Sequence, residues 1–513
     1  MPDGSSPRRI AIDVETVSLK DRTPIGLSVA TSSREALYFP LWNEDNQDVP
    51  WDLIRDDGVT KIYHNCLFDL MVLKPYKPSA NNIADTLVMA HLLNMDGELS
   101  NLVWWVDPYH AKPCRSAKAM LELAGASTML DLPQDEVAIK CCQDTIATMW
   151  VYERLKDKVD RGYFEVEMAL IPILHRMSLR GIAIDQEERA ALEEELTDEM
   201  LYYRNLAEAE GFNPGSPKQV GYILAKRGTF LPFSQGHKQL KTDVKVLEKV
   251  LDPLASMVLQ YRHYQKALGT YVIPLRGAER AYTRFHLDAA TGRISSTERN
   301  LQNIPPQIRS MFLPDSGTFT DADFSQIELR ILAYMSGDRE MQYIFESGGS
   351  IHQATAEFMN IPYKRAKNVG FGMIYGATVE TVMETAKTND KRLAQRFIED
   401  WSRKYRDAWN WIQFQQEQGL LNGKVHTLFG REFVLVQEEG EGAVRRKSVN
   451  YPIQGSAAEI FKRALIMCKH LDLANQLHDE VLIDGDVELP VGLDHIVPDL
   501  LTPVTLKKTA RWT

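Results

Sequence analysis

Two aspartates that lie far apart in the sequence both stand where a strand-like run ends. Asp323 closes the run 318–324, and a helical spacing of apolar residues follows it. Asp479 lies between the strand-like runs 473–477 and 481–483, so a hairpin would expose it at its tip. Carboxylates on adjacent strands can share a pair of divalent cations, which serve in-line displacement at phosphorus. A capping or turn role is the alternative for either aspartate taken alone.

Three further candidate residues lie between these two aspartates. Lys367, Phe371 and Tyr375 follow one another at four-residue steps before Gly376, so a helix would place all three on one face. That face presents a cation for a triphosphate and aromatic rings on which a base or sugar could stack. A buried packing stripe is the alternative, and Lys367 on the stripe argues against it.

The N-terminal region contains a second set of acids that could take part in catalysis. Asp13 and Glu15 share one side of a strand, Asp69 comes later, and Asp144 falls on an expected helix over 135–155. Brought together, four acids would bind two metal ions and direct water at a phosphodiester. Each acid taken separately is also consistent with an ordinary surface charge.

The elements that must position these residues change character along the chain. A strand-like run at 9–14 opens an alternation of short β-rich runs and helical runs such as 84–93, which indicates an α/β domain. From about Tyr163 the pattern becomes strongly helical, with a long run at 185–211 rich in Glu, Leu and Ala. We place a domain boundary near residue 160.

Composition is typical of a globular protein. The chain has 513 residues, of which 44% are hydrophobic and 25% charged, and this length allows about three domain-sized units. No run approaches the ~20 apolar residues that span a bilayer. The N-terminus lacks an apolar signal core, and the five cysteines form no spaced metal or disulfide framework. These features predict a soluble protein of a reducing cytoplasm.

The net charge of −11 argues against a polyanionic partner, because Lys and Arg supply most affinity for nucleic acid. Basic residues are nevertheless concentrated locally. Five of them fall in 259–285 against one acid, and Arg445, Arg446 and Lys447 form another cluster. Such clusters could line a groove, although charge alone favours a solvated helix face.

Six short motifs resemble those of family A DNA polymerases, in the family's order and across about residues 170 to 490. Together they are far more specific than any one of them. The motifs are Thr291 to Ser296, Leu301 to Pro305, Asp323 to Arg330, Lys367 to Gly376, Asn450 to Gly455 and His478 to Glu480.

The resemblance implies a role for each matched residue. Asp323 and Asp479 would be metal ligands, and Glu480 a nearby acid of the same tip. Glu328 matches the family's steric gate, a carboxylate beneath the sugar that leaves no space for a 2′-hydroxyl, which implies deoxynucleotide substrates. Tyr375 would pair with Glu328 and guard the template position.

The same resemblance implies residues that bind nucleotide and DNA. Lys367 would hold and protonate the triphosphate, and His352 would contact it. Phe371, where some relatives have Tyr, resembles enzymes that discriminate against dideoxynucleotides. Contacts to the primer terminus or the minor groove, where degenerate acceptors permit sequence-independent checking, are implied for Arg293, Gln302, Asn303, Arg446, Asn450, Gln454 and His478.

One position departs from the family pattern. The family usually places Arg four residues before the lysine of this helix, but here the residue is Tyr363, followed by Lys364 and Arg365. We predict that Lys364 or Arg365 supplies the missing phosphate contact. A solvated pair of cations is the alternative.

The N-terminal acids resemble the DEDD 3′→5′ exonucleases that precede family A polymerase domains. The matching features are Asp13-x-Glu15, Asn65-x-x-x-Asp69 and the helical Asp144, and Asp85-Thr86-Leu87 is a further resemblance. The four acids would hold two Mg²⁺ or Mn²⁺ ions.

The water-orienting residue of that family is missing. The family places Tyr four residues before the last Asp, or His five before, and here those positions are Lys140 and Ile139. We predict that metals bind and that proofreading occurs slowly. An inactive nuclease is the alternative.

The two resemblances imply a fold of the α/β plus α+β class. A ribonuclease-H-like exonuclease domain at 1–160 would precede a right-hand polymerase domain at 161–513. Within the latter we expect a thumb at about 186–272, a palm at 273–345 and 425–513, and fingers at 346–424.

The function implied is template-directed DNA synthesis by two-metal phosphoryl transfer, with two Mg²⁺ ions and 3′→5′ proofreading. Primer–template DNA and deoxynucleoside triphosphates are the expected partners of a monomer without membrane association. A helicase, a primase or a processivity factor are candidates for further partners.

The short segment before Asp13 leaves no room for a 5′-nuclease domain, and the compact layout resembles phage-type replicative enzymes, which would act in the host cytoplasm.

Two other functions compete with this interpretation. A stand-alone nuclease whose C-terminal part only binds DNA would not need Asp323 and Asp479. A single-subunit RNA polymerase shares the same metal chemistry, but Glu328 at the steric-gate position argues against it.

Overall fold

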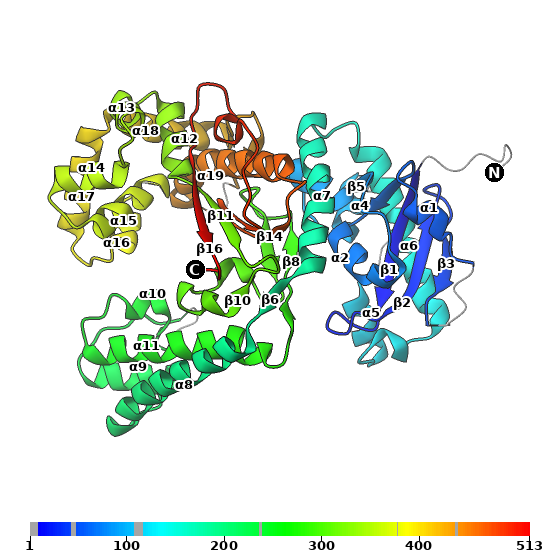
Figure 1. Ribbon diagram of the computed structural model, residues 1–513, viewed down its shortest axis with the longest axis horizontal. Helices are drawn as coiled ribbons and strands as arrows, with labels where there is room; N and C mark the ends of the chain where they lie inside the picture. The colour runs from blue at the N-terminus through cyan, green and yellow to red at the C-terminus, as the bar shows by residue number, and fades with distance from the viewer. Residues whose placement is uncertain (1–8, 43–47, 107–115, 235–238, 377, 437–439) are drawn as a thin grey trace. The chain divides into compact units, whose positions relative to one another are not determined.

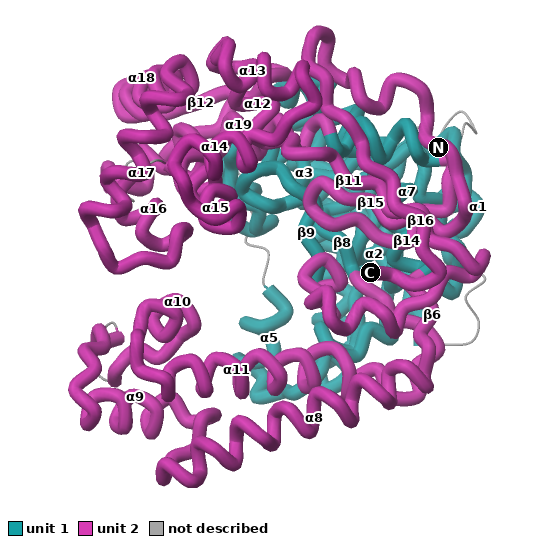
Figure 2. Tube along the Cα trace, turned by 60° about the vertical axis from the view of Figure 1, so that its left-hand side comes forward, with its two compact units in different colours: residues 1–180, 284–297, 461–469 teal, residues 181–283, 298–460, 470–513 magenta. Residues whose placement is uncertain are grey.

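The computed structural model divides the chain into two compact units, which are described separately (Figure 2). Unit 1 comprises 1–180, 284–297 and 461–469, and unit 2 comprises 181–283, 298–460 and 470–513. The structure describes residues 9–42, 48–106, 116–234, 239–376, 378–436 and 440–513.

Unit 1 is built on a five-stranded sheet of order β3-β2-β1-β4-β5. β1 runs parallel to β4, and β4 runs parallel to β5, whereas β2 and β3 join antiparallel. The strands are β1 (Arg9–Thr16), β2 (Pro24–Ala30), β3 (Leu37–Pro40), β4 (Thr60–Tyr63) and β5 (Ile83–Asp85), and β8 (Arg284–His286) pairs separately with β9 (Ser295–Thr297).

Helices pack on this sheet, and α6 lies against β1 and β2 (Figure 1). The Ser28 hydroxyl of β2 donates to the Cys141 carbonyl of α6 at 2.9 Å, so a buried hydrogen bond fixes the helix on the sheet. The helices are α1 (Trp51–Arg55), α2 (Cys66–Val72), α3 (Thr86–Leu92), α4 (Leu99–Val106), α5 (Ala117–Ala124), α6 (Gln134–Leu155) and α7 (Arg161–Arg180).

A second sheet, in unit 2, has the order β14-β15-β11-β16 and is antiparallel throughout. Its strands are β11 (Phe319–Phe324), β14 (Leu473–Leu477), β15 (Glu480–Asp484) and β16 (Val504–Thr509). The smaller sheets use β6 (Ile182–Ile184), β7 (Arg280–Ala281), β10 (Phe312–Leu313), β12 (Lys424–His426) and β13 (Glu432–Val434).

The long helices α8 and α11 of unit 2 lie side by side (Figure 2). α8 begins where the Asp185 carboxylate accepts from the amides of Glu187 and Glu188 at 3.0 and 3.1 Å, an N-cap that satisfies otherwise unpaired donors. This region contains α8 (Gln186–Ala209), α9 (Pro217–Lys226), α10 (Val244–Leu247) and α11 (Pro253–Ala267).

The remaining helices of the chain follow β11. They are α12 (Ile327–Ser336), α13 (Arg339–Glu346), α14 (Ile351–Met359), α15 (Tyr363–Ile374), α16 (Val379–Thr385), α17 (Lys391–Lys404), α18 (Arg406–Asn422) and α19 (Glu441–Met467). α12 contacts α13, α15 and α18, and α15 contacts α14 and α16.

Unit 1 extends beyond the expected boundary near residue 160. α7 contacts α2, α3 and β8, and its Leu170, Ile171 and Leu174 are fully buried. This apolar packing explains why α7 and the segments 284–297 and 461–469 cluster with the N-terminal sheet, although our expectation placed them in the polymerase domain.

Two further expectations concern the membrane and the cysteines. Within the described ranges, none of the helices has both the length and the apolar character needed to cross a bilayer. Cys66, Cys141, Cys142 and Cys468 are free thiols, and Cys114 lies outside the described residues.

A buried ion pair links two helical segments within unit 1. The Lys462 ammonium of α19 binds the Glu167 carboxylate of α7, and the two side chains are 1% and 6% exposed. The second carboxylate oxygen of Glu167 is buried without a hydrogen-bond partner among the described residues. Glu167 therefore depends on Lys462 to offset its desolvation.

We predict that Lys462→Met lowers the free energy of unfolding by ~3–5 kcal/mol, because it leaves the Glu167 charge buried and unpaired. Adding Glu167→Leu should recover most of this loss. Urea unfolding followed by tryptophan fluorescence measures both effects, and Lys469→Met, at an exposed lysine of the same segment, is the control. A double variant as unstable as the single one would contradict the prediction.

Candidate functional site

The strand register of unit 2 brings together the acids of the expected polymerase site. Asp323 in β11 lies opposite Glu480 in β15. The amide of Phe324 donates to the Asp479 carbonyl at 3.0 Å, which ties the β14–β15 turn to the end of β11. Asp323 and Asp479 therefore lie beside each other although more than 150 residues separate them in the sequence.

This proximity has an electrostatic consequence for Asp323. Burial and the neighbouring Asp479 together raise the pKa of Asp323 to about 6, against the opposing effect of the Lys367 ammonium. Two carboxylates that repel each other, faced by a cation, form a site of concentrated negative charge. Hard divalent cations such as Mg²⁺ prefer this donor chemistry, so the residues present fit the ions that the resemblance implies.

Asp321, which our sequence reasoning did not select, is a second acid on β11 and the fourth of this site, after Asp323, Asp479 and Glu480. Burial and the neighbouring Asp321 raise the pKa of Glu480 to about 7, against the opposing effect of Arg309, whose Nη1 lies 3.9 Å from Glu480 Oε1. Glu480 and Asp321 therefore lie close enough for the charge of Asp321 to disfavour ionisation of Glu480 beside Asp323. The two-residue step from 321 to 323, which puts both acids on one side of a strand, could have revealed it.

Helix α15 presents the expected face. The Lys367 ammonium lies 5.8 Å from the centre of the Phe371 ring, and the Phe371 and Tyr375 rings stack with centres 5.9 Å apart and 14° between their planes. Helix α12, whose first turn carries the 8% exposed Glu328, contacts α15. A cation and two stacked rings thus share one face, as their spacing indicated.

His352 of α14 packs behind this face. Its ring centre lies 5.9 Å from that of Phe371 and 6.0 Å from that of Tyr363, against which it packs edge-on. Burial and the nearby Lys367 charge lower the pKa of His352 to about 4, so the imidazole is neutral at pH 7. A neutral ring offers hydrogen bonds to a phosphate but no ion pair.

Tyr363, which stands where the family usually has Arg, takes part in packing. Tyr363 begins α15 and packs against His352, and Lys364 and Arg365 stand exposed on the same first turn. Both cations are accessible to an anion near this end of the helix.

A cleft of 560 Å³ joins the end of α15 to α19 within unit 2. Tyr375, Arg446 and Asn450 are among its lining residues. Gly376 follows Tyr375 at φ +120°, and a Cβ there would lie 2.6 Å from Arg446 Cγ. The glycine therefore allows the two helices to approach closely, and an aromatic ring, a guanidinium and an amide share one cleft.

The other expected DNA-binding residues are distributed over several elements. Gln302 and Asn303 lie in the 3₁₀ turn Leu301–Asn303, and Gln454 is buried in α19. His478 is exposed in the β14–β15 turn at φ +51°. Arg293 belongs to unit 1.

The four N-terminal acids also converge. Asp13 and Glu15 come from β1, Asp69 from α2 and Asp144 from α6. Burial raises the pKa of Asp13 well above its usual range, and Asp144 and Glu15 add to this shift. Burial, together with Asp13, likewise raises the pKa of Asp69. Three elements thus hold four carboxylates in one charged cluster.

Lys140 enters this cluster from the helix turn before Asp144. Its ammonium binds Glu15 and, at 2.8 Å, Asp144 Oδ2. Burial alone lowers the pKa of Lys140, but Glu15, Asp144 and Asp13 more than offset that effect and raise it well above the usual value. Ile139, at the other position that the family uses to orient water, is 55% exposed.

Cys141 is a further member of the cluster that sequence reasoning missed. Its thiol donates to Asp13 Oδ2 at 3.5 Å, and ligand atoms of Asp13, Glu15 and Cys141 all lie within 4.8 Å of one another. The spacing of the cysteines in the sequence could not reveal this contact, because the partners of Cys141 are carboxylates on β1.

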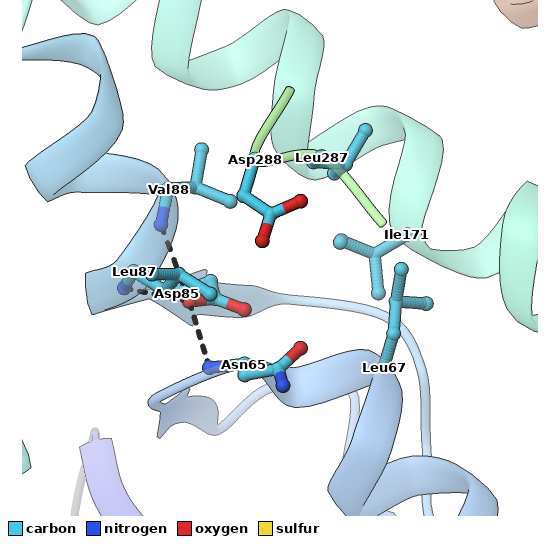
Figure 3. Close-up of a pocket in the computed structure, with 8 residues that line it drawn as sticks. All are labelled: Asn65, Leu67, Asp85, Leu87, Val88, Ile171, Leu287 and Asp288. Carbon is cyan, nitrogen blue, oxygen red and sulfur yellow. Dashed lines mark hydrogen bonds between the residues drawn. The ribbon is translucent and has the colours of Figure 1, made fainter. Parts of the chain in front are cut away.

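Asp85 supports the cluster through the backbone (Figure 3). Its carboxylate accepts from the amide of Leu87 at 2.8 Å, which caps α3, and from the amides of Asn65 and Cys66 at 3.1 and 2.7 Å. These bonds fix the turn before α2, which carries Asp69. The matched Asp85 is thus a residue that orients the site.

Two family models match the chain. A model described as DNA polymerase family A matches residues 184–499, and one described as 3′-5′ exonuclease matches residues 3–160. Together they cover the regions that contain the two acidic clusters.

Curated relatives extend this similarity. DNA polymerase I of Chloroflexus aurantiacus is 29% identical over 96% of this chain and 59% of its own length. The thermostable DNA polymerase I of Thermus filiformis is 33% identical over 65% of this chain and 45% of its own. This chain therefore spans about half the length of such relatives.

Among solved structures, the polymerase domain of Pol1 from M. smegmatis, in complex with DNA primer-template and dNTP, matches with a TM-score of 0.78. The match is 21% identical and covers 98% of this chain and 95% of that one. At this identity it shows the fold, and the two family models confirm the expected order, an exonuclease domain followed by a polymerase domain.

The geometry around His352 yields a prediction about its protonation. Replacing Lys367 by Met should raise the pKa of His352 from about 4, because a nearby positive charge is removed, but not to the ordinary ~6.5, because burial remains. NMR titration of histidine-labelled protein measures this, with His352→Gln to assign the resonance. An unchanged or lower pKa would show that Lys367 does not face the ring.

Proposed function

This chain belongs to DNA polymerase family A, and we propose that it extends a DNA primer with deoxynucleotides along a template. The observation that supports this most strongly is the meeting of Asp323 and Asp479 at one edge of the unit 2 sheet, opposite the Lys367 charge of α15. Mg²⁺ ions held by the two carboxylates would lower the pKa of the primer hydroxyl and neutralise charge on the leaving phosphate.

The reaction is an in-line displacement. The primer 3′-oxygen bonds to the α-phosphorus, the bond from that phosphorus to the bridging oxygen breaks, and pyrophosphate leaves. The hydroxyl proton passes to solvent. Lys367 can bind the triphosphate and donate a proton to the pyrophosphate, while the neutral His352 offers it a hydrogen bond.

Binding of the template and of the sugar follows from the surrounding residues. Tyr375 and Arg446 in the 560 Å³ cleft can stack on a base and bind a phosphate. Buried Glu328 would exclude a 2′-hydroxyl. The M. smegmatis fold neighbour was solved with DNA primer-template and dNTP, which supports the same partners here.

We propose a second activity for unit 1, namely 3′→5′ exonucleolytic proofreading. The match to an exonuclease family model and the convergence of four carboxylates support it. In this reaction a water oxygen bonds to the terminal phosphorus and the bond from phosphorus to the 3′-oxygen of the preceding nucleotide breaks. A nucleoside 5′-monophosphate leaves, and the shortened strand keeps a 3′-hydroxyl.

The family-model boundaries, 3–160 and 184–499, support the expected exonuclease and polymerase domains, and we propose the expected thumb, palm and fingers within the latter. A role in DNA replication fits both activities. The phage-type role, the cytoplasmic location, the monomeric state and the helicase, primase or processivity-factor partners stay predictions, and the relatives named above are bacterial.

The proposal predicts that the intact chain extends a labelled primer with dNTPs and Mg²⁺, and that Asp479→Ala slows extension on the order of 10³-fold, as expected when several kcal/mol of charge stabilisation are lost. Asp486→Ala, at an exposed acid near the far end of β15, should leave the rate unchanged. If the intact chain does not extend the primer in this gel assay, a nuclease that only binds DNA becomes the better account.

Substrate choice depends on Glu328. In Glu328→Ala, the preference for dNTPs over rNTPs in kcat/KM should fall by about 10–10²-fold, because the space for a 2′-hydroxyl opens. Single-nucleotide incorporation kinetics with each substrate measure the ratio, and Glu340→Ala, at an exposed glutamate of α13, is the control. An unchanged ratio would assign the discrimination to other residues.

The exposed cations of α15 provide a third test. In Lys364→Ala/Arg365→Ala, KM for dNTPs should rise about tenfold with little change in kcat, because a charge-assisted hydrogen bond to phosphate is worth ~1.5–3 kcal/mol. Lys391→Ala/Arg392→Ala removes an equally exposed Lys–Arg pair from the first turn of α17 as a matched control. Equal KM values for the two double variants would show that Lys364 and Arg365 are solvated surface charges.

A further inference from the structure

Lys140 lies between two acids of the exonuclease cluster that come from different elements. Its ammonium contacts Glu15 on β1 and Asp144 on its own helix, and its side chain is 10% exposed. An ammonium at this depth cannot be solvated as a surface lysine is, so the carboxylates are what hold it in place.

The backbone of α6 at this point is fixed independently of the charges. The Cys141 carbonyl accepts hydrogen bonds from the hydroxyls of Ser28 on β2 and Thr145 on α6, each at 2.9 Å. Both hydroxyls are fully buried. The Ser28 bond therefore anchors α6 against the sheet at the residue next to Lys140.

The Lys140 ammonium occupies carboxylate oxygens that a metal ion would need as ligands. It takes up one oxygen of Glu15 and Oδ2 of Asp144, and a divalent cation bound to the same oxygens would meet a positive charge at contact distance. Among the described residues, the ion pairs of Lys140 go to Glu15 and Asp144 and not to Asp13 or Asp69, and Asp144 Oδ1 is buried without a hydrogen-bond partner.

The total charge of the cluster also argues against a second divalent ion. Four ionised carboxylates carry a charge of −4, and Lys140 reduces it to −3. One divalent ion would leave −1, whereas two would leave +1 in a buried site. Burial penalises net charge of either sign, but only the second ion would also have to displace an existing ion pair.

We propose that the Lys140 ammonium is a built-in cation of the exonuclease site, so that the site binds one divalent ion where the family resemblance implied two. The single ion would be held by Asp13, Asp69 and the second oxygen of Asp144. This inference rests on the proposed nuclease function of unit 1, and it gives Lys140 the role of a fixed positive charge, which a neutral Tyr at this position could not supply.

The number of ions can be counted directly. In the full-length Asp323→Ala/Asp479→Ala background, which removes the polymerase ligands, Mn²⁺ binding followed by electron paramagnetic resonance should show one ion per chain. Adding Lys140→Met should raise the count to two, and Lys140→Arg, which keeps a cation, should leave it at one. Adding Asp13→Ala to the background identifies the site, because the single ion should then be lost.

The count in the Lys140-containing background decides the matter even if Lys140→Met does not fold. Two ions, or none, in that background would overturn the proposal, as would a count that stays at one in a folded Lys140→Met chain. One ion in the background and two in Lys140→Met would establish it.

Degradation of single-stranded DNA separates this inference from the proposed function. With Asp13→Ala as the blank, the rate at low Mg²⁺ should rise with the first power of the Mg²⁺ concentration, and a second-power dependence would contradict a one-ion site. No degradation combined with one bound Mn²⁺ would refute the nuclease function while leaving the ion count intact.

Discussion

Repulsion between neighbouring carboxylates is the free-energy cost that both units of this chain must offset. In unit 2, the pairing of β11 with β15 sets Asp323 beside Asp479 and Glu480, and in unit 1 the packing of α6 on β1 sets Asp144 beside Asp13. Burial raises the pKa values of Asp323 and Asp13, and this repulsion raises them as well. Stable sheets with fixed registers can bear it, because their cores provide the compensating stability.

The two units balance this charge in different ways. At the polymerase site the balancing cation, Lys367, stands exposed on a helix, where it can also meet a triphosphate. At the exonuclease site Lys140 is buried in direct contact with two acids. An accessible cation can act on a substrate, whereas a buried one changes what else the acids can bind.

Much of the polymerase site could be predicted from the sequence. The strand at 319–324, the hairpin that carries Asp479 and the shared face of Lys367, Phe371 and Tyr375 all follow from local periodicity and were found as expected. Local patterns specify such features because each depends on residues a few positions apart.

Other features depended on tertiary packing and could not be read from spacing. The sequence showed that Lys140 replaces a tyrosine, but the direction of its ammonium is set by the anchoring of α6 on β2. The role of Cys141 and the inclusion of 284–297 and 461–469 in unit 1 likewise depend on contacts between distant segments. Asp321 was detectable, since it shares a strand face with Asp323, but a lone acid in a strand carries little signal by itself.

We propose that Asp323 and Asp479 jointly hold the divalent ions that catalyse DNA synthesis. The most direct measurement is a crystal structure with primer–template DNA, an incoming dNTP and Mn²⁺, with anomalous scattering to locate the ions. We predict two peaks that both contact carboxylate oxygens of Asp323 and Asp479, next to the triphosphate and facing Lys367. A bound triphosphate without an anomalous peak at these two aspartates would contradict the account.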